Sequence, residues 1–187
     1  MKRIGLAVAA VTLWALPVAA DTRALVMPFD NIARDRRIFS AVDRTSQDKC
    51  CLYAGDLPWQ LEMAAPYLVQ LERDDWFTHY LLEHGWGNSW GIFFRSETSL
   101  KNLRHHLRGF LRVRDEANHR LLFRYYDPRV LRVYLPTCRR AELETMFGPI
   151  DRFLMEGEDP DSLIEDTFDG KHLQRARVSL VTDPALR

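Results

Sequence analysis

The sequence predicts a single domain of the mixed α/β (α+β) class, in which helices pack against a mixed β-sheet. Its 187 residues suit one domain with a sizeable core. Hydrophobic residues make up 47% of the chain and charged residues 28%, which is typical of a globular protein and excludes a fully disordered, collagen-like or coiled-coil chain. Strand-like and helix-like segments alternate along the chain, without an internal repeat or a Gly/Ser linker. This alternation predicts a mixed or partly parallel sheet.

Segments in the N-terminal half differ in the period of their apolar residues and in the residues that bound them. We expect strands at 23–29, 49–53, 67–71 and 90–95, and helices at 32–43, 58–64 and 74–85. The helix at 32–43 places its apolar side chains near one face. Asp74 or Asp75 suits the start of the helix that ends at Gly85. Residues 90–95 are rich in aromatic and branched side chains, which favours a buried strand.

The C-terminal half begins with a leucine-rich helix, capped by Thr98 or Ser99 and ended by Gly109. Two strands then follow, at 110–114 and 120–125, and the polar residues between them predict a hairpin. The pair Asp127-Pro128 predicts the next helix, with the carboxylate as N-cap and the proline in the first helical position. That helix breaks at Pro136-Thr137. We expect Thr137 to cap a last helix that ends at Phe147-Gly148-Pro149.

Residues 1–20 have the layout of a secretory signal peptide. A short basic lead of Lys2 and Arg3 precedes an uncharged apolar run, and small residues precede Asp21. The run is too short to span a bilayer comfortably, so we expect no stable membrane insertion. An apolar N-terminal helix packed on the domain is the alternative. The predicted organisation is therefore 1–20 as signal peptide or helix, 21–150 as the main domain and 151–187 as an acidic C-terminal extension.

Charge is balanced in the total but not along the chain. The 26 basic and 26 acidic residues give a formal net charge of zero, which does not favour a protein that binds polyanions. The segment from Arg104 to Arg140 contains ten arginines and three acidic residues, whereas 151–169 contains eight acidic residues and one arginine. The two segments either meet in the fold or form solvated faces, or the basic one docks an acidic partner. Nucleic-acid binding is the least favoured interpretation, because the arginines follow strand and helix patterns and form no exposed tail.

No motif for catalysis, a cofactor or a metal stands out. The sequence has no Gly-x-Ser-x-Gly elbow, P-loop or dinucleotide fingerprint, and its histidines have no ligand spacing. We expect Cys50, Cys51 and Cys138 to be reduced, since a disulfide between the adjacent pair would be strained. The sequence therefore predicts a protein that is not an enzyme and that needs no cofactor.

The most informative stretch is residues 121–131, which we expect to run from a buried strand directly into a capped helix. Arg124 and Arg129 lie close enough in sequence to Asp127 for a charge-assisted hydrogen-bond network. A structural network is the favoured interpretation over direct contact with a partner.

On these segments the chain resembles the type VI secretion effector chaperones or adaptors that share domain of unknown function 4123. The resemblance spans roughly residues 23–150, in the family's order. Its most specific part is Leu122 through Leu131, and further matches are 52–55, 65–69, Gly85-Trp86-Gly87, 90–96, 107–113, 135–137 and 147–149.

This resemblance implies a non-catalytic chaperone or adaptor in the bacterial cytoplasm. Such a protein binds a cognate secreted effector and helps to load it onto the VgrG spike. A complementary face with aromatic and arginine anchors would serve this task. The candidate partner-binding residues are Trp86, Trp90, Arg124, Tyr125, Tyr126 and Arg129, with Asp127 and Pro128 as the structural motif.

Two alternatives stay open. If residues 1–20 are a working signal peptide, the chain would be an exported periplasmic binding or immunity-like protein that begins at Asp21. A less favoured alternative is a cryptic enzyme or nucleic-acid binder, with a polar pocket or a salt-sensitive basic face.

Overall fold

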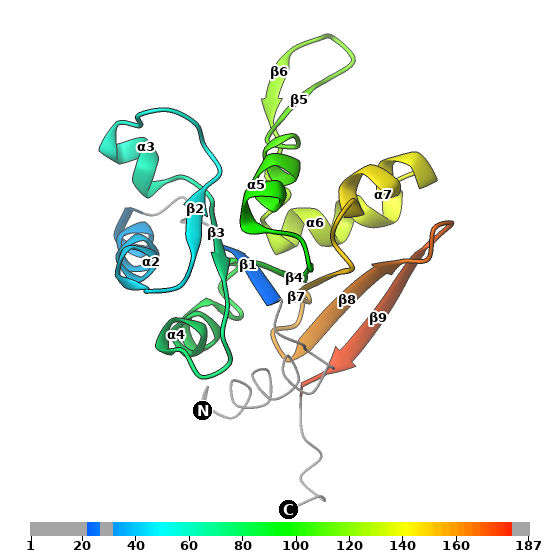
Figure 1. Ribbon diagram of the computed structural model, residues 1–187. Helices are drawn as coiled ribbons and strands as arrows, with labels where there is room; N and C mark the ends of the chain where they lie inside the picture. Colours follow the sequence, from blue (N-terminus) through cyan, green and yellow to red (C-terminus); the bar gives the residue numbers. More distant parts are fainter. Residues whose placement is uncertain (1–21, 27–31, 181–187) are drawn as a thin grey trace, which may run out of the picture.

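A seven-stranded sheet with helices on both faces forms the body of the protein (Figure 1). The computed structural model describes residues 22–26 and 32–180, with side chains from residue 37 onward. The strand order is β2-β3-β1-β4-β7-β8-β9, and a separate hairpin contains β5 and β6. The mixed α+β single-domain fold predicted from the sequence is thus confirmed.

The strands of the main sheet are short except at its C-terminal edge. They are β1 (Thr22–Val26), β2 (Lys49–Cys51), β3 (Tyr67–Gln70), β4 (Gly91–Arg95), β7 (Arg152–Glu156), β8 (Ser162–Phe168) and β9 (Leu173–Ser179). Every pairing among the described strands is antiparallel. The fold class is therefore confirmed, but the expectation of parallel strand pairs in the sheet is wrong. The reason lies in the connection from β3 to β4. These strands run in the same direction, but β1 lies between them and is antiparallel to both.

Two hydrophobic cores lie on opposite faces of the sheet. The helices α2 (Ile32–Arg44) and α4 (Trp76–Gly85) cover one face. The other is covered by α5 (Leu100–Arg108), α6 (Pro128–Tyr134), a 3-10 turn η1 (Leu135–Thr137) and α7 (Arg140–Phe147). The short helix α3 (Trp59–Met63) lies beside the sheet and contains no buried residue (Figure 1).

Alternation along the strands divides the apolar side chains between these two cores. In β4, Phe93 packs with the α2 and α4 side, whereas Ile92 and Phe94 pack with the α5 to α7 side. In β3, Val69 and Leu68 separate in the same way. Burial on both faces explains why these strands are nearly continuous apolar runs. Each fully buried side chain of this kind contributes about 1.5–3 kcal/mol.

The helix starts follow the capping residues that the sequence offers. Asp75 and Ser99 accept hydrogen bonds from the backbone N–H groups of Phe77 and Asn102, which confirms one of the two caps proposed for each helix. The prediction that Thr137 caps the last helix is wrong. Its hydroxyl donates to the carbonyl of Tyr134, and the N-cap of α7 is Arg139.

The predicted strand 120–125 is shorter in the structure. The hairpin strands are β5 (Arg112–Arg114) and β6 (Arg120–Leu122), and both are exposed along their length. Tyr125 and Tyr126 follow the strand as a buried turn before α6. The expectation of a buried strand running directly into the helix is therefore wrong, because burial begins only where the chain leaves the hairpin.

The segment set apart in the sequence as an acidic extension supplies β7, β8 and β9 of the main sheet. Asp166 in β8 is buried and forms a two-pronged ion pair with Arg175 of β9, at 2.6 Å for both contacts. Glu165 pairs with Arg152 of β7. These acids are thus neutralised by arginines of the same C-terminal strands.

Two predictions fall outside the described residues. The signal peptide or helix predicted at residues 1–20 is one, and the Pro28 end of the first strand is the other. Within the described part of the chain, no helix is long and apolar enough to cross a membrane.

Candidate binding site

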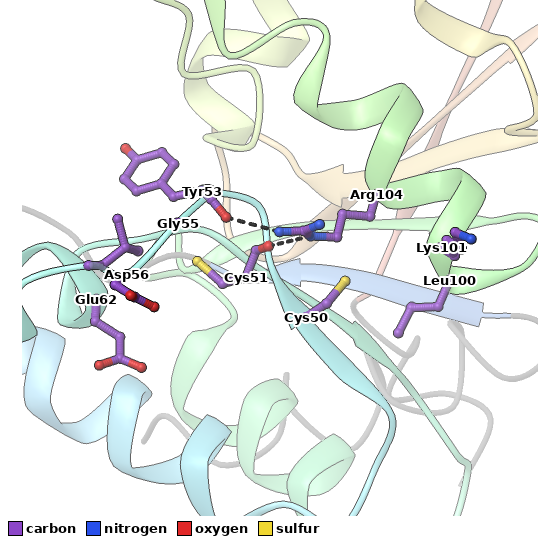
Figure 2. Close-up of a pocket in the computed structure, with 10 residues that line it drawn as sticks. Cys50, Cys51, Tyr53, Gly55, Asp56, Glu62, Leu100, Lys101 and Arg104 are labelled. Atoms are coloured by element: carbon purple, nitrogen blue, oxygen red, sulfur yellow. Dashed lines mark hydrogen bonds between the residues drawn. The ribbon is translucent and has the colours of Figure 1, made fainter.

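A groove at the free edge of β2 is a concave surface of the described part of the chain. Its volume is about 660 Å³. It is lined by β2, the loop after it, one residue of α3 and the first turns of α5, through Cys50, Cys51, Tyr53, Gly55, Asp56, Leu57, Glu62, Leu100, Lys101 and Arg104. Figure 2 shows Asp56 and Glu62 on one side of β2, and Lys101 and Arg104 on the other. The groove therefore presents opposite charges on its two walls.

Arg104 covers part of the exposed strand edge. Its Nε donates to the carbonyl oxygen of Cys51 at 2.7 Å, and its Nη2 donates to that of Tyr53 at 3.0 Å (Figure 2). Because β2 is the outermost of the described strands, these two carbonyls pair with no other described strand. An edge strand with free backbone groups is a place where another chain can pair. Arg104 thus controls access to this edge.

The groove thiols are not poised for nucleophilic chemistry. Burial raises the pKa of Cys50 to about 11, although the charge of Arg104 acts in the opposite direction. Burial likewise raises the pKa of Cys51. The thiolate is the reactive form, so a raised pKa makes a cysteine less reactive at neutral pH. Cys50, Cys51 and Cys138 are all free, and the described residues contain no group of three or more His, Cys, Asp or Glu that could hold a metal ion.

Arginines extend the positive wall of the groove toward the hairpin. Burial raises the pKa of Tyr53, and the charges of Arg112 and Arg124 act against that rise. Arg108 acts in the same way on Cys51. Residues Lys101, Arg104 and Arg108 follow a helical spacing along α5. A positive stripe therefore runs from the groove to the base of the hairpin.

An exposed apolar surface adjoins the groove on α3. Trp59 is 56% exposed and Leu61 is 51% exposed, on the same short helix that contributes Glu62 to the groove. The two side chains are two residues apart on the helix and so point to different sides of it, and each leaves a large apolar group exposed near the groove. The sequence pattern did not single out Trp59 and Leu61, because an apolar residue in a short helix is usually part of the core.

The four aromatic residues predicted as partner anchors lie in the interior. Trp86 and Trp90 belong to the core beneath α4, and Tyr125 and Tyr126 belong to the core beneath α5 and α6. The Tyr125 hydroxyl donates to the carbonyl of Leu107 at 2.8 Å and so ties the end of α5 to the start of α6. In this conformation the four side chains offer a partner little surface, and their role as anchors stays a prediction.

The glycine-rich turn around Trp86 is held by a buried carboxylate. Glu156 of β7 accepts hydrogen bonds from the Gly87 backbone N–H and the Ser89 hydroxyl. Trp86 donates from its indole nitrogen to the carbonyl of Pro160 at 2.7 Å. The turn is thus part of the scaffold that joins α4 to the C-terminal strands.

The junction before α6 is built on Asp127. Its buried carboxylate accepts from the Arg129 backbone N–H at 2.9 Å and forms an ion pair with the exposed Arg129 guanidinium at 2.9 Å. Arg124 joins through its main chain, whose carbonyl accepts from the Asp127 N–H. Pro128 occupies the first turn of α6, as expected. Of the charge-assisted network predicted for Asp127 with Arg124 and Arg129, the ion pair with Arg129 is confirmed.

Comparison with known protein families matches residues 29–145 to the family described as "Domain of unknown function (DUF4123)". The match covers more than half of the chain. The chain belongs to the DUF4123 family. The matched region extends from the start of α2 through most of α7, and includes β2, α3, the groove and the hairpin. In this DUF4123 chain, the strands β7 to β9 lie beyond the match but complete the same sheet. Searches of curated proteins and of solved structures find no match.

Proposed function

We propose that this DUF4123 protein is a non-catalytic chaperone or adaptor that binds a cognate type VI secretion effector and helps to load it onto the VgrG spike. Family membership supports the proposal through the role that the resemblance implies. The observation that carries it is the edge of the sheet at β2, where Arg104 covers two backbone carbonyls and a charged groove adjoins the helix with the exposed Trp59 and Leu61.

This edge has the physical features that a client-binding surface needs. Exposed tryptophan and leucine side chains can bury apolar area of a client, and aromatic residues carry much of the energy of such contacts. Once Arg104 moves off the carbonyls of Cys51 and Tyr53, the backbone edge of β2 can pair with an extended client segment. The acidic wall at Asp56 and the basic wall at Lys101 then fix the orientation of the segment through charge. A contact of this kind is reversible, as transfer to a spike protein requires.

Affinity purification of the tagged chain from its own cells, with mass spectrometry of what co-purifies, tests the proposal. We expect one effector-like polypeptide in a stoichiometric complex. Trp59→Ser should reduce its recovery, whereas Val133→Ser, at an equally exposed residue of α6, should leave it unchanged. Recovery of no client protein, or equal recovery with Trp59→Ser, would contradict the proposal.

The signal-like pattern of residues 1–20 favours a second candidate, an exported periplasmic binding or immunity-like protein. The same purification separates the two. Envelope proteins as the only partners, with a bait whose first residue is Asp21, would support export. An intact N-terminus and a cytoplasmic effector would support the adaptor.

A further inference from the structure

The β5–β6 hairpin projects away from the body of the protein as an arm (Figure 1). Its two strands pair with each other and with no other described strand. An isolated two-stranded hairpin is marginally stable in water unless something packs against it. The arm therefore has two unpaired edges and two faces on which a partner can pack.

On one face of the arm, apolar side chains form a row that starts at the core and extends toward the tip. Leu111 is buried, and its carbonyl accepts from the Phe123 N–H at 3.0 Å. Phe123 packs on the ring of Tyr134, with centroids 4.6 Å apart. Farther out on the same face, Val113 and Leu121 lie directly opposite each other and are 37% and 48% exposed. Leu111 and Phe123 therefore anchor the arm to the body of the protein, whereas Val113 and Leu121 are left partly exposed.

The other face is positively charged. Arg114 and Arg120 are paired directly across the strands, next to Arg112 opposite Leu122. Like charges in directly opposite positions destabilise a strand pair. Arg114 turns toward Asn118 in the turn, and no described carboxylate forms an ion pair with Arg112 or Arg120. At the tip, Asp115 accepts hydrogen bonds from His119, while Glu116 is exposed.

The acids of the C-terminal strands do not neutralise this face. Asp166 pairs with Arg175, Glu165 pairs with Arg152, and Glu156 holds the turn at Gly87. The positive charge of the arm is therefore available to another molecule. An anion seated between Arg114 and Arg120 would relieve their repulsion.

We propose that the β5–β6 arm docks an extended acidic segment of the client, in which acidic residues alternate with apolar ones. The inference rests on the proposed function and names the surface and the chemistry of its partner. Because side chains alternate along a strand, such a segment pairs with a free edge of the hairpin and places its apolar residues on the face that holds Val113 and Leu121. Its carboxylates then lie on the face that holds Arg112, Arg114 and Arg120.

The direct test uses a labelled ten-residue peptide of alternating glutamate and valine, titrated with the full chain by fluorescence anisotropy. We expect binding that weakens with salt, and at least tenfold weaker binding with Arg120→Glu and with Leu121→Asp. The matched controls are Lys171→Glu for charge and Val133→Asp for an exposed apolar site, and both should bind as the parent chain does. Thermal unfolding monitored by circular dichroism verifies that every variant is folded.

Three results would overturn the inference: equal binding by the parent chain and the hairpin variants, equal binding of a lysine–valine peptide, or preferred binding of a single-stranded oligonucleotide at the arm. Hydrogen exchange provides a second measurement, in which the peptide should protect residues 112–122. If the peptide does not protect residues 112–122 from exchange, docking on the arm is contradicted.

Failure of this inference is distinguishable from failure of the proposed function. If the parent chain recovers a client from cells and Leu121→Asp recovers it equally well, the arm is not the docking surface and the adaptor role stands. If the parent chain recovers no client, the adaptor role itself fails.

Discussion

Asp127 serves at once as the N-cap of α6 and as the buried partner of Arg129. Replacing it with alanine removes the cap and leaves the Arg129 backbone N–H unpaired, which together cost about 1–2 kcal/mol. We expect Asp127→Ala to lower the free energy of unfolding by this amount in a denaturant titration. Glu144→Ala, which breaks the exposed pair with Arg140, should change it by less than about 0.5 kcal/mol. Equal effects of the two substitutions would contradict the role given to Asp127.

Gly148 is required for two separable reasons. Its backbone has a φ of 47°, and a Cβ atom there would lie 2.4 Å from Cε1 of His106. Gly148→Ala should therefore cost more than the backbone strain of a positive φ alone. Gly170→Ala is the matched control, because Gly170 has a φ of 86° and open space around it. Adding His106→Ala should recover part of the loss at Gly148, and an equal loss in the two glycine variants would contradict the steric explanation.

Glu156 should make stability depend on pH. Burial raises the pKa of its carboxyl group in the folded protein, against the hydrogen bonds from Ser89 and Gly87 that lower it. The folded chain then holds this proton to higher pH than the unfolded chain does. The stability that this bound proton adds is fully present below the ordinary pKa of glutamate. It is lost as the pH rises through the higher pKa that Glu156 has in the folded protein. Glu156→Gln should therefore gain stability relative to the parent chain from pH 4 to pH 7. A constant difference across that range would contradict this explanation.

Among the elements, β2 depends on Arg104 to cover its edge. Arg104→Met keeps the aliphatic stem but exposes the carbonyls of Cys51 and Tyr53. Open strand edges pair with other chains. We expect this variant to self-associate in sedimentation velocity measurements. Lys101→Met, on the same helix, should sediment as the parent chain does. A monomeric Arg104→Met variant would show that the edge is protected in another way.

Element types were predictable because capping residues and apolar periods are local signals. Asp75, Ser99 and Asp127 begin their helices as the sequence indicates. Strand neighbours were not predictable, since the insertion of β1 between β3 and β4 depends on contacts that are distant in sequence. The aromatic anchors were ambiguous for another reason. Large rings suit both cores and interfaces, so Trp86 and Trp59 could not be told apart before their burial was known.

At the scale of the whole molecule, the strands beyond the family match complete both cores. Leu154 and Leu163 pack on the α4 side, and Phe153 and Met155 pack on the α7 side. Removal of residues 151–187 would expose those surfaces and the edge of β4. We expect the truncated chain to lack a cooperative thermal unfolding transition. A cooperative transition like that of the full chain would show that 151–187 is an extension and not part of the folding unit.

Delivery of the client tests directly whether this DUF4123 chain loads an effector, as proposed. The measurement is the amount of client bound to VgrG in cells with and without the chain, once the client has been identified by co-purification. We predict that client on the spike falls to background without the chain and returns when the chain is restored, while VgrG itself is unchanged. Unchanged client on VgrG in cells that lack the chain would contradict the account.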